Sequence, residues 1–182
     1  RLKWILPILL LWFEPAISRE IMAESAMPGD RKIKHPMHGA DRFAINTSSY
    51  RQGWSVEACL KHLNDRGFHH FEVTPHPGFL RPDDMDKAGC AHFQRFLAGH
   101  RLRIVALNTT AADVDVTAVS AEARLQSLDF LERCVTLGGD IGSQGVVVGI
   151  GRGDCLRAAP REQLQDYLFK ALDRLTRAAE HG

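Results

Sequence analysis

Glu72 is the residue whose type and position most clearly suggest chemistry. It lies inside the apolar segment His70–Thr74, where a carboxylate costs free energy unless it is paired or used. We interpret it as an acceptor for a ligand hydroxyl, or as a support for a group that binds the ligand. The alternative is a salt bridge to a neighbouring arginine or lysine.

Three further polar residues lie in or just after apolar segments. His76 could donate a hydrogen bond to a ligand oxygen or move a proton near neutral pH, or it could be an exposed loop histidine. Asn108 could offer a hydroxyl both a donor and an acceptor, or it could cap the loop backbone. Asn46 has the same two interpretations.

Arg152 is the fifth candidate, and it lies in the glycine-rich segment Gly149–Gly153. Backbone amides beside a guanidinium suit a phosphate or a carboxylate. The alternative is an ion pair with Asp154 or Glu162. The segment does not complete the dinucleotide fingerprint G-x-G-x-x-G, because Asp154 stands where the third glycine is needed and the next helix begins only near Pro160.

A repeating pattern of strand and helix positions these residues. The apolar spacing predicts strands at 43–47, 70–74, 103–107 and 145–150, and a helical segment follows each strand. The helices are predicted from Ser55 to Gly67, from about Asp83 to Gly99, from Ser120 to Gly138–Gly139, and from Pro160 in its first turn onward.

This order predicts an α/β fold with a parallel sheet and right-handed crossovers. Two architectures share it, namely an open doubly wound sheet and a (β/α)₈ barrel. In a barrel the active site lies at the carboxyl ends of the strands, and that rule selects the five residues above.

Dispersed motifs along the pattern support a family resemblance. They are Ile45–Thr47, Trp54–Ser55, Gly67–Val73, Leu102–Asn108, Ser127–Cys134 and Val146–Gly153. These motifs resemble the xylose isomerase-like TIM-barrel family, whose members are sugar phosphate isomerases or epimerases and are related to AP-endonuclease barrels. The resemblance covers about residues 43–182.

The resemblance implies that residues 43–182 are the first four β/α units of a TIM barrel, since a full barrel needs about 250 residues. It implies isomerisation or epimerisation of a small sugar or sugar phosphate by proton transfer, assisted by Mn²⁺ or Mg²⁺. The family's metal ligands lie on later strands, so we expect none in this chain and no turnover from this fragment alone. Residues Asn46, Glu72, His76, Asn108 and Arg152 would form the wall of the substrate pocket.

Two other interpretations stay open, namely a non-catalytic half-barrel that pairs with another chain or with itself through its sheet edges, and a secreted carbohydrate-binding barrel. The endonuclease branch fits less well. Its metal-binding histidines would follow the second and third strands, where this chain has Thr74-Pro75-His76 and Leu107-Asn108-Thr109. The net charge of +1 also gives no field that favours nucleic acid, so we expect no such partner.

Residues 1–42 differ from the rest. The apolar run Trp4–Phe13 is too short for a bilayer, which needs about 20 residues, so no membrane span is expected. We expect a disordered leader and linker, or upstream sequence wrongly included, with both chain ends being cuts. An export signal is the alternative. The four cysteines show neither a C-x-x-C pair nor zinc spacing, so we expect buried free thiols and a cytoplasmic protein.

Overall fold

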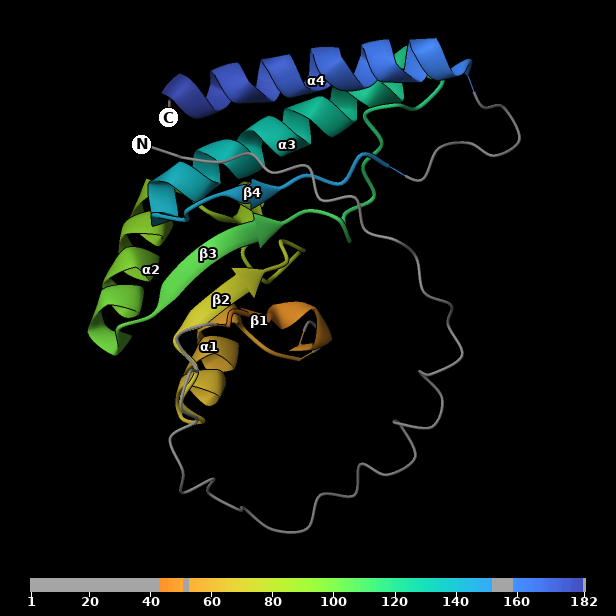
Figure 1. The fold of residues 1–182 in the computed structure, drawn as a ribbon. Coiled ribbons are helices and arrows are strands. Elements are labelled where there is room, and N and C mark those ends of the chain that lie inside the picture. Colours follow the sequence, from red (N-terminus) through yellow and green to blue (C-terminus); the bar gives the residue numbers. More distant parts are fainter. Residues whose placement is uncertain (1–42, 51–52, 152–158, 182) are drawn as a thin grey trace, which may run out of the picture.

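The computed structural model describes residues 43–50, 53–151 and 159–181, so the leader at 1–42 and Arg152 lie outside the described residues. Four parallel strands form one sheet in the order β1-β2-β3-β4 (Figure 1). The elements are β1 (Ile45–Asn46), η3 (Thr47–Tyr50), α1 (Val56–Asn64), β2 (His70–Val73), η4 (Pro82–Asp84), α2 (Lys87–His100), β3 (Arg103–Asn108), α3 (Ala121–Ile141), β4 (Val146–Val147) and α4 (Arg161–His181).

The strand order decides between the two architectures. An open doubly wound sheet reverses its strand order and carries helices on both faces, whereas a barrel places each strand beside the previous one. Here the order follows the chain, and Phe71, Val73 and Leu107 are buried in a single core with residues of the helices. The fold is that of consecutive β/α units of a TIM barrel, as predicted.

One irregularity in β3 decides which of its side chains face the helices. Pairing with β2 runs in step up to Ile104, and Glu72 then lies opposite Ala106, which leaves Val105 as an extra residue. In a regular strand, residues three apart face opposite sides of the sheet. Because of the extra residue, Ile104 and Leu107 are both buried in the core, with 2% and 0% of their surface exposed.

Three helices begin where the local signals place them or one residue away. Ser55 and Ser120 cap α1 and α3 as predicted, since their hydroxyls accept the backbone N–H groups of Ala58 (3.2 Å) and Ala123 (3.3 Å). Pro160 lies just before α4 instead of inside its first turn, and its carbonyl accepts the first hydrogen bonds of that helix.

The start of α2 was predicted too early. Residues 82–84 form the 3-10 turn η4, and the α-helix begins at Lys87. The cause is Asp86, whose carboxylate accepts the N–H of Gly89 at 2.7 Å and so caps the helix there. At the other end, α2 runs one residue past the predicted Gly99, and Arg101 takes the left-handed conformation that ends it.

The end of α3 also differs from the prediction. The helix continues through Gly138–Gly139 to Ile141, and Gly142 ends it with a φ of 76°. A Cβ on Gly138 would lie 3.4 Å from Cγ2 of Val146, which is an ordinary van der Waals contact. The predicted stop at Gly138–Gly139 is wrong, because a helix tolerates glycine in its interior and the left-handed residue that ends α3 is Gly142.

The two outer strands are shorter than predicted. β1 covers 45–46 instead of 43–47, and β4 covers 146–147 instead of 145–150. Each pairs with a neighbour on one side within the described sheet. After Asn46 the chain turns directly into η3, which ends the extended backbone.

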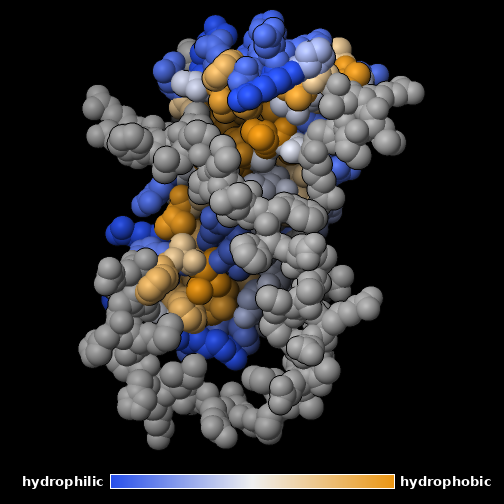
Figure 2. All heavy atoms as spheres, turned by 45° about the vertical axis from the view of Figure 1, so that its right-hand side comes forward, coloured by the Kyte–Doolittle hydropathy of each residue, from blue (hydrophilic) through white to orange (hydrophobic). Residues whose placement is uncertain are grey.

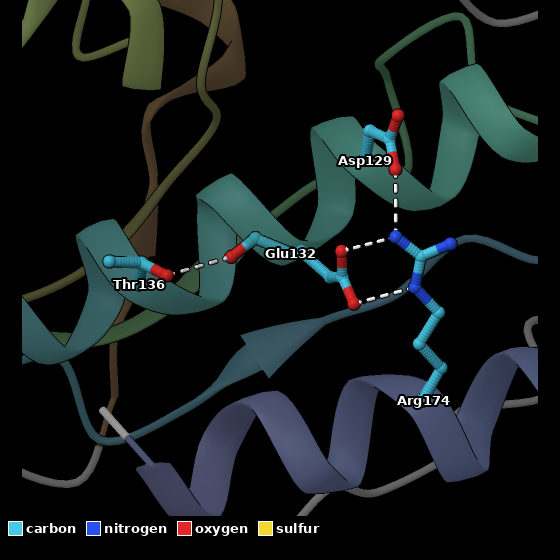
Figure 3. Close-up of polar contacts among 4 residues, drawn as sticks. All are labelled: Asp129, Glu132, Thr136 and Arg174. Carbon is cyan, nitrogen blue, oxygen red and sulfur yellow. Dashed lines mark hydrogen bonds and ion pairs between the residues drawn. The ribbon is translucent and has the colours of Figure 1, made fainter.

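Helix α4 packs along α3 (Figure 1). The buried side chains among its described residues are Ala171 and Leu175. Hydrophilic residues dominate the upper end of the face shown in Figure 2, where α4 lies. Arg174 links the helices: Nε and Nη2 donate to the two carboxylate oxygens of Glu132 (2.7 and 2.6 Å), and Nη2 also donates to Asp129 (2.8 Å), as Figure 3 shows. These bonds raise the pKa of Arg174 above its ordinary value.

Cys59, Cys90 and Cys134 are buried free thiols, as predicted, and Cys155 lies outside the described residues. Burial raises the pKa of Cys59 to about 11 and that of Cys134 to about 12, because a thiolate loses its hydration there. Within the described part of the chain, no helix combines the length and apolar character that crossing a membrane requires.

The raised thiol pKa values predict a pH dependence of stability. An unfolded cysteine ionises near its ordinary pKa of 9.0, so the contribution of each buried neutral thiol is complete below pH 9 and is lost as the pH rises through about 11 to 12. We expect Cys59→Ala to reduce the fall in unfolding free energy between pH 9 and 11 by about 2 kcal/mol. Denaturant titrations at several pH values measure this. The difference at pH 7 gives the cavity cost separately, and an unchanged pH slope would contradict the assignment.

The hydrogen bonds of Arg174 to α3 predict that removing its guanidinium lowers the stability of the protein, and that this loss is smaller at high salt. Arg174→Met keeps the apolar stem and removes three charge-assisted hydrogen bonds, so we expect a loss of about 1 kcal/mol at low ionic strength. Arg177→Met is the matched control, because Arg177 pairs with Asp173 on its own exposed helix face and we expect a loss below about 0.5 kcal/mol. Thermal unfolding at low and high NaCl compares them; equal losses would show that the link between the helices contributes nothing beyond a surface pair.

Candidate active site

Three of the predicted residues meet at the carboxyl end of the sheet. Asn46 lies opposite Glu72 in the register of β1 and β2, and Asn108 is the last residue of β3. Nδ2 of Asn46 donates a hydrogen bond to Oε1 of Glu72, and Nδ2 of Asn108 donates to the same oxygen at 2.6 Å. Residues far apart in the sequence therefore form one polar cluster, which we call the Glu72 cluster.

The orientation of both asparagines follows from their own loops. Oδ1 of Asn46 accepts the backbone N–H of Ser48 at 2.7 Å, and Oδ1 of Asn108 accepts that of Thr110 at 2.9 Å. A backbone N–H can only donate, so each amide oxygen faces its loop and each NH₂ group faces Glu72. The loops thus aim the donors at the carboxylate without help from a ligand.

Two buried threonines next to these asparagines were missed in the sequence. Thr47 Oγ1 accepts the backbone N–H of Thr74 at 3.3 Å, and Thr109 Oγ1 donates to a backbone carbonyl of β4 at 2.9 Å. Both side chains are fully buried. The signal was present, because Asn-Thr-Ser after β1 and Asn-Thr-Thr after β3 repeat the same polar pattern at equivalent strand ends.

Glu72 keeps one oxygen available. Its side chain is half-buried, and Oε2 has no hydrogen-bond partner among the described residues, although it is open to solvent. No described arginine or lysine lies within ion-pair distance of this carboxylate, so the salt-bridge alternative gains no support. Oε2 can accept a hydrogen bond from a ligand hydroxyl or take a proton from it.

His76 lies just beyond β2 and is not hydrogen-bonded to the Glu72 cluster. Its Nδ1 pairs with the carbonyl of Pro77 at 2.9 Å, and its ring stacks on Phe79 with centroids 4.8 Å apart. Its Nε2 is buried and has no hydrogen-bond partner in the described part of the protein. Water, a ligand or a residue outside the described part of the chain can satisfy a buried nitrogen of this kind.

The glycines before Arg152 have a structural reason of their own. A Cβ on Gly149 would lie 3.1 Å from Cα of Thr110, and a Cβ on Gly151 would lie 2.2 Å from Oδ1 of Asp115. Gly151 also has a φ of 99°, which side chains rarely allow. The segment after β4 therefore needs glycine to approach the loop after β3, and the anion site at Arg152 stays a prediction outside the described residues.

The described residues do not form a metal site. No group of three or more histidine, cysteine, aspartate or glutamate side chains among them is arranged to hold a metal ion. What these side chains can offer a ligand is hydrogen bonding from the Glu72 cluster and from His76.

The fold is similar to solved structures of sugar epimerases. A D-tagatose 3-epimerase-like protein aligns with a TM-score of 0.63 at 13% identity, covering 76% of this chain and 49% of that one. The 3-keto-D-glucoside 4-epimerase of E. coli gives 0.58 at 15% identity, with 76% and 51% covered. L-ribulose 3-epimerase gives 0.56 at 20% identity, with 75% and 46% covered. The chain therefore spans about half the length of these proteins.

The sequence comparison is more specific about the family. Comparison with curated proteins gave no match. The family model described as xylose isomerase-like TIM barrel matches residues 60–182, which is more than half of the chain. With the parallel sheet in barrel order, this match shows that the chain belongs to the xylose isomerase-like TIM barrel family.

Proposed function

We propose that the Glu72 cluster binds hydroxyl groups of a small sugar in a protein that isomerises or epimerises sugars by moving a proton beside a carbonyl. The observation that carries this proposal is the Glu72 carboxylate, held from one side by Asn46 and Asn108 and open at Oε2. Family membership and the names of the solved structures above support the class of substrate.

The geometry suits a hydroxyl better than an anion. Both amide donors of the cluster are used by Oε1 of Glu72, and the atom left to a ligand is a carboxylate oxygen, which accepts hydrogen bonds. A sugar hydroxyl donates to such an oxygen, whereas a phosphate or carboxylate would be repelled by it. A phosphorylated sugar would need a separate anion site, for which Arg152 is the predicted residue.

The metal that the family implies is not assigned to these residues. A divalent ion, Mn²⁺ or Mg²⁺ in our proposal, has no ligand set among the described side chains. The role proposed for Glu72, Asn46 and Asn108 is to hold and orient a substrate hydroxyl.

Glu72→Gln tests the proposal with little change of shape. The glutamine oxygen can keep both bonds from the asparagines, so the amide NH₂ takes the place of Oε2 and turns an acceptor into a donor. We expect the affinity for D-tagatose or L-ribulose to fall by about 10- to 100-fold, the loss of one hydrogen bond to a charged group. Titrations of the full chain followed by NMR measure the dissociation constants.

Glu180→Gln is the matched control, because Glu180 is an exposed residue of α4. It should bind each ketose as the wild type does, and circular dichroism should show the same fold for both variants. Ketose binding that Glu72→Gln leaves unchanged would remove the carboxylate from the site. Wild-type protein that binds neither sugar at any accessible concentration would overturn the proposed function itself.

A further inference from the structure

A groove of about 630 Å³ lies between the loop after β2, the loop after β3 and the amino-terminal half of α3. Pro75, Ala111 and Phe130 give it apolar walls, while His76 and Gln126 contribute polar groups. Its volume falls within the range of about 300–1,000 Å³ that is usual for small-molecule sites. It contains none of the three residues of the Glu72 cluster.

The hydrogen bond at Nδ1 of His76 fixes which ring nitrogen carries the hydrogen when the ring is neutral. A carbonyl oxygen accepts hydrogen bonds, so Nδ1 carries the hydrogen that it donates to Pro77. In the neutral ring Nε2 is then an acceptor, and it has no partner among the described residues. Stacking on Phe79 fixes the plane of the ring. Any group that satisfies Nε2 of the neutral ring must bring a hydrogen-bond donor, as a hydroxyl does.

The charged residues that line the groove balance one another, so the lining carries no excess charge that would select an anion. Arg81 and Arg133 share one carboxylate, since their Nε atoms lie 3.0 and 3.2 Å from the two oxygens of Asp83. Asp113 and Asp115 add negative charge to the lining. The guanidinium of Arg81 lies 5.4 Å from the ring centroid of Phe130, so a planar polar group and an apolar face adjoin. This combination suits the hydroxyls and C–H faces of a neutral sugar.

The loops that line the groove follow residues of the Glu72 cluster along the chain. His76 is four residues beyond Glu72, and Ala111 is three beyond Asn108. Because extended chain covers at most about 3.6 Å per residue, the Cα atom of His76 lies within about 14 Å of that of Glu72. We propose that the groove binds the second unit of a larger carbohydrate whose reacting sugar is held at Glu72, so that the substrate is a disaccharide or glycoside. This inference rests on the proposed function.

The test compares D-fructose with a disaccharide in which glucose is linked to O6 of fructose, using the full chain and NMR titration. We expect the disaccharide to bind at least about 10-fold more tightly than fructose, from the added contacts in the groove. Ala111→Trp fills the groove from an exposed position and should bring the ratio of the two affinities close to one. Ala98→Trp, at an exposed position of α2 that does not line the groove, should leave the ratio unchanged.

The remaining outcomes distinguish a failure of this inference from a failure of the proposed function. If fructose binds through Glu72, as judged with Glu72→Gln, but the disaccharide binds no more tightly, the inference is wrong and the proposed function stands. A ratio that Ala111→Trp does not change also overturns the inference. If inorganic phosphate binds in place of the disaccharide and Ala111→Trp abolishes that binding, the groove is an anion site. If neither sugar binds, the proposed function fails and the inference fails with it.

Discussion

The extra residue Val105 in β3 sets which side chains the sheet presents to each face. Without it, Ile104 and Leu107 could not both face the helices, because three residues of regular strand reverse the side. Burying each of these side chains contributes about 1.5–3 kcal/mol, which exceeds the net contribution of roughly 1 kcal/mol from one hydrogen bond of a regular ladder. The same shift puts Asn108 on the face of Glu72. Packing of the core therefore determines the geometry of the polar cluster.

Parallel pairing places these polar groups at one edge of the sheet, where each buried group needs a hydrogen-bond partner. A buried hydroxyl without a hydrogen-bond partner costs about 1–3 kcal/mol. The hydroxyls of Thr47 and Thr109 avoid this cost, because each forms a hydrogen bond with the backbone in or just after the neighbouring strand. The asparagine before each threonine is fixed by its own loop. Because these contacts form during folding, the donors that hold Glu72 need no rearrangement when a ligand arrives.

The sequence correctly predicted the features of the fold that depend on residues close together in the chain. The repeating pattern of strands and helices and the serine caps Ser55 and Ser120 act over three or four residues, so they can be recognised in one segment. The cap at Asp86 is also local, but it was not recognised in the sequence. Two other features that were missed involve distant partners. Gly138 lies inside a helix that packs against β4, and the extra residue Val105 shows only in the pairing of β3 with β2.

The candidate site shows the same division. The rule that barrel sites lie at the carboxyl ends of strands selected Asn46, Glu72, His76 and Asn108 one by one, because each lies in or just after an apolar segment. It could not separate them into two groups. That separation comes from hydrogen bonds: two asparagines converge on Oε1 of Glu72, while His76 turns its Nδ1 to Pro77. Spacing in a sequence does not encode which nitrogen of a histidine carries the hydrogen.

The loop after β3 joins the cluster and the groove, and its anchoring explains how both can be ordered without a ligand. Thr110 fixes the orientation of Asn108 at one end of the loop. At the other end, the N–H of Asp115 donates to Ser127 on α3 at 2.9 Å, and its carboxylate accepts two hydrogen bonds from Thr117. The conformational entropy of this loop is thus lost when the chain folds, and a sugar that binds along it does not have to order it again.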